Sequence, residues 1–171
     1  MNPRRFLWPR VAPEEPAIEP DTVTALSAKL DAGMQQRLGR SVAILHLDAG
    51  DCGGCEIELR AVRSAVYDLQ RFGIRFVVSP RQADVLLVTG PVTYNLVAAL
   101  EQAHAAMPEP KMVVALGDCA VDGGVFKGGY AVAGGAGTTV PVDLLIGGCP
   151  PAPERIVAGL RALLEANARR K

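Results

Sequence analysis

Hydrophobic residues beyond position 40 fall into short runs that alternate with amphipathic stretches. Mostly apolar runs predict strands at residues 42–47, 74–78, 84–89, 112–116 and 142–146. Between and after them, apolar residues spaced three and four apart predict helices: one from Cys55 to Gly73, one around residues 96–107 and one after Pro151. The face of the first of these helices would carry Leu59, Val62, Val66 and Leu69. Strands alternating with helices predict an α/β domain, and this order favours a flavodoxin-like, doubly wound parallel sheet.

The first 40 residues follow a different pattern. Residues 1–19 are rich in proline and arginine, show no helical or strand period, and contain the apolar trio Phe6, Leu7 and Trp8. Apolar residues at positions 23, 26, 30, 34 and 38 then predict an amphipathic helix. We therefore divide the chain into an N-terminal arm and helix (1–40) and a flavodoxin-like domain (41–171). The arm is expected to dock onto a partner, and a disordered tail is the open alternative.

Charge and hydropathy exclude several classes of protein. The 18 basic and 18 acidic residues cancel, whereas a nucleic-acid binder usually shows a basic excess. No apolar run reaches the length of about 18 residues that a membrane span requires, and no apolar stretch of a secretory signal follows the N-terminal arginines. We therefore expect a cytoplasmic chain with no nucleic-acid partner and no membrane span of its own.

All four cysteines directly follow predicted strands. Cys52 and Cys55 come after the first strand, Cys119 after the strand at residues 112–116, and Cys149 after the last strand. The carboxyl ends of parallel strands share one edge of a sheet, where ligands bind at the point at which the strand order reverses. Cysteines almost 100 positions apart are therefore expected to converge. In a reducing compartment such cysteines more often bind metals or catalyse than form disulfides.

Glycines and a proline around these cysteines favour an iron–sulfur cluster. Each cysteine has glycine close by, which lets the backbone approach a bulky inorganic core. Cys55 and Cys149 are expected to open helices, whose N-termini favour an anionic cluster, and Cys149-Pro150 matches the Cys-Pro pair common at such ligands. Two alternatives stay open: a structural zinc site, which usually has two close cysteine pairs, and a thioredoxin-like dithiol made by Cys52 and Cys55 alone.

Four stretches of the chain resemble a known protein family. They are DCGGCEIE (51–58), SPRQAD (79–84), GDCAVDGG with YAV (117–124 and 130–132), and PVD with GCPP (141–143 and 148–151). On these motifs, the chain from about Leu47 resembles the small electron-transfer subunit shared by respiratory NADH:quinone oxidoreductase (the 20-kDa or B subunit) and the nickel–iron hydrogenases. The resemblance implies that Cys52, Cys55, Cys119 and Cys149 hold one proximal 4Fe–4S cluster at the carboxyl rim of the sheet.

Details of the motifs indicate a branch of that family. The quinone-reductase branch typically has adjacent tandem cysteines, whereas two glycines separate Cys52 from Cys55 here, as in hydrogenase small subunits. Asp118 before Cys119, and the lack of a further cysteine-bearing domain, are similar to the energy-converting hydrogenases and formate hydrogenlyase. The resemblance thus implies an electron-transfer subunit of an oxidoreductase complex, with no catalysis of its own. It would be peripheral on the cytoplasmic membrane through its partners.

The partners that this resemblance implies are a hydrogenase-like large subunit, a ferredoxin-like subunit with further clusters, and membrane subunits. Two alternatives stay open for the function. One is the B subunit of an NADH:quinone oxidoreductase-type complex that reduces quinone. The other is a non-catalytic module whose metal or cluster is structural or sensory.

Other polar residues receive weaker predictions. The resemblance implies that Glu56, which follows Cys55, lies near the subunit interface as a proton relay or cluster-tuning group; the alternative is a first-turn acid stabilised by the helix dipole. His46 and His104 are expected to be structural. The segment 117–137 holds eight glycines, so we expect a cluster and a partner to order it, with Val125, Phe126 and Tyr130 as partner contacts or, alternatively, as part of the core.

Overall fold

The computed structural model describes residues 41–64, 67, 69 and 74–168. The arm with Phe6, Leu7 and Trp8 and the helix predicted between residues 21 and 39 lie outside the described residues. The proposed division at residue 40 therefore stays a prediction.

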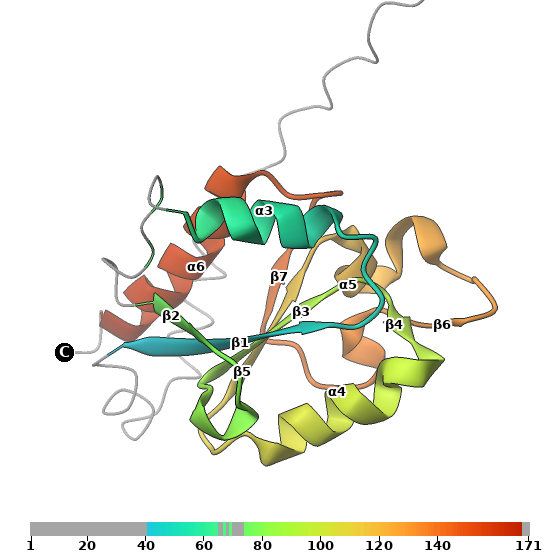
Figure 1. The fold of residues 1–171 in the computed structure, drawn as a ribbon, viewed down its shortest axis with the longest axis horizontal. Helices are drawn as coiled ribbons and strands as arrows, with labels where there is room; N and C mark the ends of the chain where they lie inside the picture. Colours follow the sequence, from blue (N-terminus) through green and yellow to red (C-terminus); the bar gives the residue numbers. More distant parts are fainter. Residues whose placement is uncertain (1–40, 65–66, 68, 70–73, 169–171) are drawn as a thin grey trace, which may run out of the picture.

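The described chain is built of alternating strands and helices (Figure 1). In chain order the elements are β1 (Val42–Asp48), α3 (Gly54–Val62), β2 (Ile74–Val77), η3 (Pro80–Gln82), β3 (Val85–Thr89), β4 (Val92–Thr93), α4 (Tyr94–Ala106), β5 (Met112–Leu116), α5 (Asp118–Asp122), η4 (Gly124–Phe126), β6 (Val132–Gly134), η5 (Ala136–Thr138), β7 (Leu144–Ile146) and α6 (Pro153–Ala168). The main sheet has five parallel strands in the order β2-β1-β3-β5-β7. This is the flavodoxin-like order. The chain adds β2 on one side of β1 and the later strands on the other side, so the order of strand addition reverses between β1 and β3. The predicted parallel α/β sheet is confirmed.

Two hydrophobic cores lie on opposite faces of the sheet. Alternate side chains of each strand point to opposite faces, so Val42 and Ile44 of β1 pack under α3 and α6, while Leu45 packs on the side of α4. Figure 1 shows α3 and α6 on one side of the sheet and α4 on the other. Every residue of β3 and β5 is buried, as expected for central strands covered on both faces. The two helical layers leave the carboxyl ends of the strands open for a site.

The first predicted helix is shorter in the structure than the apolar pattern indicated. Leu59 and Val62 are buried on α3 as predicted, but α3 ends at Val62. The N–H of Ser64 donates to the carbonyl of Ala61 (3.0 Å), a tight turn that closes the helix, and Leu69 is buried beyond it. Val66 and Gly73, two positions of the predicted helix, lie outside the described residues.

The glycine-rich segment 117–137 contains more regular structure than the sequence predicted. It forms α5, two 3₁₀ turns and β6, and β6 pairs with β4 in a small antiparallel sheet. These elements are two to five residues long, too short to leave a periodic pattern. The segment is held in part by its own backbone hydrogen bonds, such as Gly123 N–H to the Cys119 carbonyl (2.9 Å).

Within the described ranges, no helix combines the length and the hydrophobicity needed to cross a lipid bilayer.

Candidate metal centre

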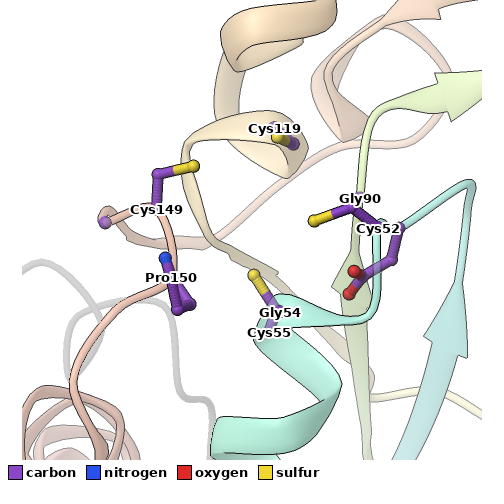
Figure 2. Close-up of a pocket in the computed structure, with 9 residues that line it drawn as sticks. Cys52, Gly54, Cys55, Gly90, Cys119, Cys149 and Pro150 are labelled. Carbon is purple, nitrogen blue, oxygen red and sulfur yellow. The ribbon is translucent and has the colours of Figure 1, made fainter.

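The four cysteines line one hollow at the carboxyl edge of the sheet. Cys52 and Cys55 follow β1, Cys119 lies just after β5 and Cys149 just after β7. Figure 2 shows the four sulfurs pointing inward toward a common space. The remaining lining residues are Asp51, Gly54, Gly90, Gly148 and Pro150. The convergence predicted from the strand ends is therefore observed, and all four thiols are free of disulfides.

The hollow opens where the strand order reverses. The loop after β1 carries Asp51 and Cys52, and Gly90 directly follows β3, the neighbour of β1 on the other side from β2. A Cβ atom on Gly90 would lie 2.3 Å from the backbone nitrogen of Asp51, so the two loops touch through their backbones. Doubly wound sheets bind ligands in the crevice at this position.

Two glycines let the backbone pack directly against sulfur. A Cβ atom on Gly117 would lie 2.6 Å from Sγ of Cys55, and one on Gly124 would lie 2.9 Å from Sγ of Cys119. Both glycines also have positive φ angles, +89° and +51°. A side chain at either position would collide with a cysteine sulfur, so the cysteine positions depend on these glycines.

The cysteines sit on local structure that differs in part from the prediction. Cys55 is the second residue of α3, as predicted, and Cys119 is the second residue of α5, which was not predicted. Cys149 was expected to open a helix, and that expectation is wrong because α6 begins only at Pro153. A residue before proline is disfavoured in helical geometry, and both Cys149 and Pro150 precede a proline. Proline at position 153, in contrast, suits the first position of a helix.

Burial divides the four thiols into two pairs. Cys55 and Cys119 are buried, whereas Cys52 and Cys149 are exposed. Burial raises the pKa of Cys55 to about 12, with the Asp51 carboxylate as the next cause. Burial also raises the pKa of Cys119, against a hydrogen bond from the Val125 backbone that lowers it. At neutral pH these buried groups therefore favour the protonated thiol unless a bound cation stabilises the thiolate.

The residues around the hollow fit a sulfur-ligated group larger than one ion. Four thiols form a soft donor set, which selects zinc, copper(I) or iron–sulfur clusters. The four sulfurs share one hollow, which is open at its mouth. Four sulfurs around a single zinc ion would instead meet at about 2.3 Å from one point. Among the residues described, no three Cys, His, Asp or Glu side chains are grouped closely enough to hold one ion.

Glu56 lies outside the hollow although it follows Cys55. Its Oε1 accepts hydrogen bonds from Nη2 (2.7 Å) and Nε (3.2 Å) of Arg60, one helical turn later, in a pair whose side chains are well exposed. The pair resembles the ordinary i,i+4 pair of a surface helix.

The two histidines also lie outside the hollow. Nε2 of His46 is 2.9 Å from Oγ1 of Thr89, and burial lowers the His46 pKa. Burial also lowers the pKa of His104, whose carbonyl accepts a hydrogen bond from Nζ of Lys111 (2.9 Å). Neither histidine lines the hollow, and the structural role expected for both stays a prediction.

Sequence reasoning missed one polar residue of the hollow, Asp51. Its Oδ1 accepts a hydrogen bond from the Gly53 N–H, while its Oδ2 is buried without a hydrogen-bond partner among the described residues. The only signal in the sequence was an acid directly before the first cysteine, which reads equally well as a loop residue.

Large apolar side chains are exposed beside the hollow. We call Tyr94, Val125, Phe126 and Tyr130 the apolar loop; their exposed fractions are 64%, 78%, 42% and 100%. The Tyr94 N–H donates to the Ala131 carbonyl (3.0 Å), which joins the start of α4 to this loop. The alternative that Val125, Phe126 and Tyr130 fold into the core is wrong, because all three side chains are exposed. The hydrogen bond from Val125 to Cys119 connects the loop to the hollow.

Comparison with known proteins gives consistent matches. Residues 52–163 match the family described as NADH ubiquinone oxidoreductase, 20 Kd subunit. Formate hydrogenlyase subunit 7 of Escherichia coli K12 is 40% identical over 159 residues, which cover 93% of this chain but 62% of that protein. The probable membrane-bound hydrogenase subunit mbhJ of Pyrococcus furiosus is 41% identical over 128 residues, 75% of this chain and 77% of that one. This chain thus spans less than two thirds of its Escherichia coli relative.

A solved structure shares both fold and sequence with this chain. It belongs to the membrane-bound sulfane sulfur reductase, an archaeal respiratory membrane complex. The two chains superpose with a TM-score of 0.69 at 34% sequence identity, covering 79% of this chain and 75% of the other.

Proposed function

Because this chain belongs to the family of the 20-kDa subunit of NADH ubiquinone oxidoreductase, a family of oxidoreductase-complex subunits, we propose that it carries one 4Fe–4S cluster and transfers electrons in a hydrogenase-like complex. The observation that carries this proposal is the hollow itself, where four cysteines from three loops point toward one another. A 4Fe–4S cluster takes four thiolate ligands, and when bound it supplies a one-electron redox couple.

The four proposed ligands lie in two different environments. Cys55 and Cys119 form the inner wall, where Gly117 and Gly124 bring backbone against their sulfurs. Cys52 and Cys149 form the mouth, which is open in the single chain. The Val125 N–H donates to the Cys119 sulfur, and hydrogen bonds of this kind raise the reduction potential of a cluster by stabilising its added negative charge.

We place the electron-transfer partner over the mouth of the hollow. Electrons reach a buried redox centre only over short distances, so the exposed side of Cys52 and Cys149 is where a partner must come close. The apolar loop stands beside the hollow, and exposed aromatic side chains are enriched at protein interfaces. A hydrogenase-like large subunit is the proposed occupant. A ferredoxin-like subunit and membrane subunits would complete the complex and hold this chain at the cytoplasmic membrane.

We further propose that Glu56 acts in that complex as a proton relay or as a group that tunes the cluster. It is the residue after Cys55, and its side chain is partly exposed on the first turn of α3. Its ion pair with Arg60 would have to open or be shared with the partner for a proton to pass.

Two features favour the hydrogenase type over a quinone-reducing B subunit. Two glycines separate Cys52 from Cys55, and the relatives at 40% and 41% identity are subunits of formate hydrogenlyase and of a probable membrane-bound hydrogenase. A chain purified without oxygen would show a broad visible absorption that dithionite bleaches if it carries the cluster. A colourless protein containing zinc would instead favour a structural or sensory module.

A substitution in the apolar loop tests where the large subunit docks. Phe126→Asp places a charge in the proposed interface and should lower co-purification of the large subunit about thirtyfold, the effect of losing an interface residue worth about 2 kcal/mol. Iron content of the chain should stay unchanged, because the Phe126 side chain does not line the hollow. Val78→Asp is the matched control: Val78 is 96% exposed and follows β2, at the other edge of the sheet from β7.

Two results would contradict this docking surface. If the complex survives Phe126→Asp, the large subunit docks elsewhere. If iron is lost while the Val78 variant keeps it, the loop belongs to the cluster fold rather than to an interface.

A further inference from the structure

Asp51 places a carboxylate in the wall of the hollow. It lies between β1 and Cys52, and its Oδ1 accepts the Gly53 N–H. Its other oxygen, Oδ2, is buried and has no hydrogen-bond partner in the part of the chain that the structure describes. A buried carboxylate oxygen without a partner costs free energy, because it has given up water without gaining another hydrogen-bond donor. The chain therefore bears a cost at this position that a neutral residue would avoid.

The surrounding loops hold Asp51 in place from two sides. Oδ1 of Asp48 accepts hydrogen bonds from the backbone N–H groups of Gly50 (2.8 Å) and Asp51 (2.6 Å). On the other side, the backbone of Gly90 is so close that a Cβ there would lie 2.6 Å from Cα of Asp51. These contacts fix the backbone of Asp51, and the Gly53 N–H holds its carboxylate beside the cysteines.

The other acids next to the cysteines are compensated or solvated. Glu56 pairs with Arg60 at the surface. Asp118 is exposed, and its Oδ1 accepts the Gly148 N–H (2.7 Å). Solvent and partner groups screen charges of this kind, whereas a desolvated charge acts at nearly full strength on its neighbours.

We propose that the Asp51 carboxylate lowers the reduction potential of the cluster, an inference that rests on the proposed function. Reduction adds one negative charge to the group that the four cysteines hold. A fixed carboxylate with a desolvated oxygen in the same wall repels that charge, so the oxidised form is favoured. This role explains why the loop keeps a buried acid oxygen that nothing in the described chain satisfies. Asp51 would thus determine which electron carriers the subunit can reduce.

The test is a redox titration of Asp51→Asn, followed by electron paramagnetic resonance, on the full chain in its native complex. Asparagine keeps the shape and an oxygen that can accept the Gly53 N–H, but removes the charge. We expect the equilibrium to shift about tenfold toward the reduced cluster, which is about 59 mV more positive for a one-electron couple. Asp48→Asn is the matched control, because it removes the same charge from an exposed acid at the end of β1, three positions before Asp51. It should shift the equilibrium by no more than about twofold, or about 18 mV.

An unchanged potential in Asp51→Asn, or an equal shift in Asp48→Asn, would overturn the inference. If Asp51→Asn holds no cluster, the comparison is made between Asp51→Glu and Asp51→Gln, which match in size and differ in charge. The Gln variant should then have the higher reduction potential. Equal reduction potentials in these two variants would overturn the inference. Loss of the cluster from all three variants would assign Asp51 to building the loop and would overturn it too. A wild-type chain without a cluster is detected before any variant and contradicts the proposed function itself.

Discussion

Replacing Cys119 by serine is expected to remove most of the iron and sulfide from the purified chain. The Cys119 sulfur is buried in the wall of the hollow, packed against Gly124 and hydrogen-bonded by the Val125 N–H. A serine oxygen is a harder donor than a thiolate and gives up its proton far less readily than a thiol, so the cluster would keep only three soft anchors. Iron and sulfide should fall from about four each per chain to less than about one.

The control for this prediction lies in the same short helix. Val121→Thr changes the chemistry of a half-buried side chain two positions away with little change in shape, and it should leave the iron and sulfide content unchanged. The assignment of four cysteine ligands is wrong if Cys119→Ser still contains about four iron and four sulfide per chain.

Replacing Gly117 by alanine should also lower the iron content of the chain, although all four cysteines are kept. A Cβ at this position would lie 2.6 Å from Sγ of Cys55, and the backbone angles of φ +89° and ψ 152° are accessible almost only to glycine. The Gly117 N–H also donates to the Ile146 carbonyl (2.7 Å), so the peptide cannot rotate away freely. Backbone strain alone costs about 1–3 kcal/mol, which lowers the melting temperature by about 2–12 °C in a chain of this size. Because the methyl group displaces the Cys55 sulfur, we also expect the iron content to fall.

Gly137→Ala is the matched control for the glycine prediction. Gly137 is exposed, its φ is not positive, and a Cβ there would meet nothing within 4 Å. Melting temperature and iron content should therefore match the unmodified chain. If Gly117→Ala also melts and loads iron normally, the close approach of this backbone to Cys55 has no part in building the site.

The sequence predicted those parts of the fold that depend on residues close together in the chain. β3 and β5 are buried on both faces, so their apolar runs identify them with almost the right ends. The end of α3 was misplaced because the apolar spacing continues to Leu69 after the hydrogen bonds of the helix have stopped at Val62. β4 and β6 are two and three residues long, and only their pairing in space makes them strands.

The site was predictable in position but not in detail. Four cysteines after strands of a parallel sheet must converge, whatever the side chains around them, and they do. The division into buried Cys55 and Cys119 and exposed Cys52 and Cys149 depends on how three loops pack, which no spacing in the sequence records. The same holds for Asp51, whose Oδ2 is buried and whose backbone meets Gly90 from the loop after another strand.

Metal and sulfide analysis of the chain purified without oxygen tests whether the four cysteines hold one 4Fe–4S cluster. We expect about four iron and four sulfide per chain, together with a paramagnetic signal of about one spin per chain that appears when dithionite adds one electron. A colourless chain with about one zinc, or one with no metal and four free thiols after iron and sulfide have been supplied, would contradict it.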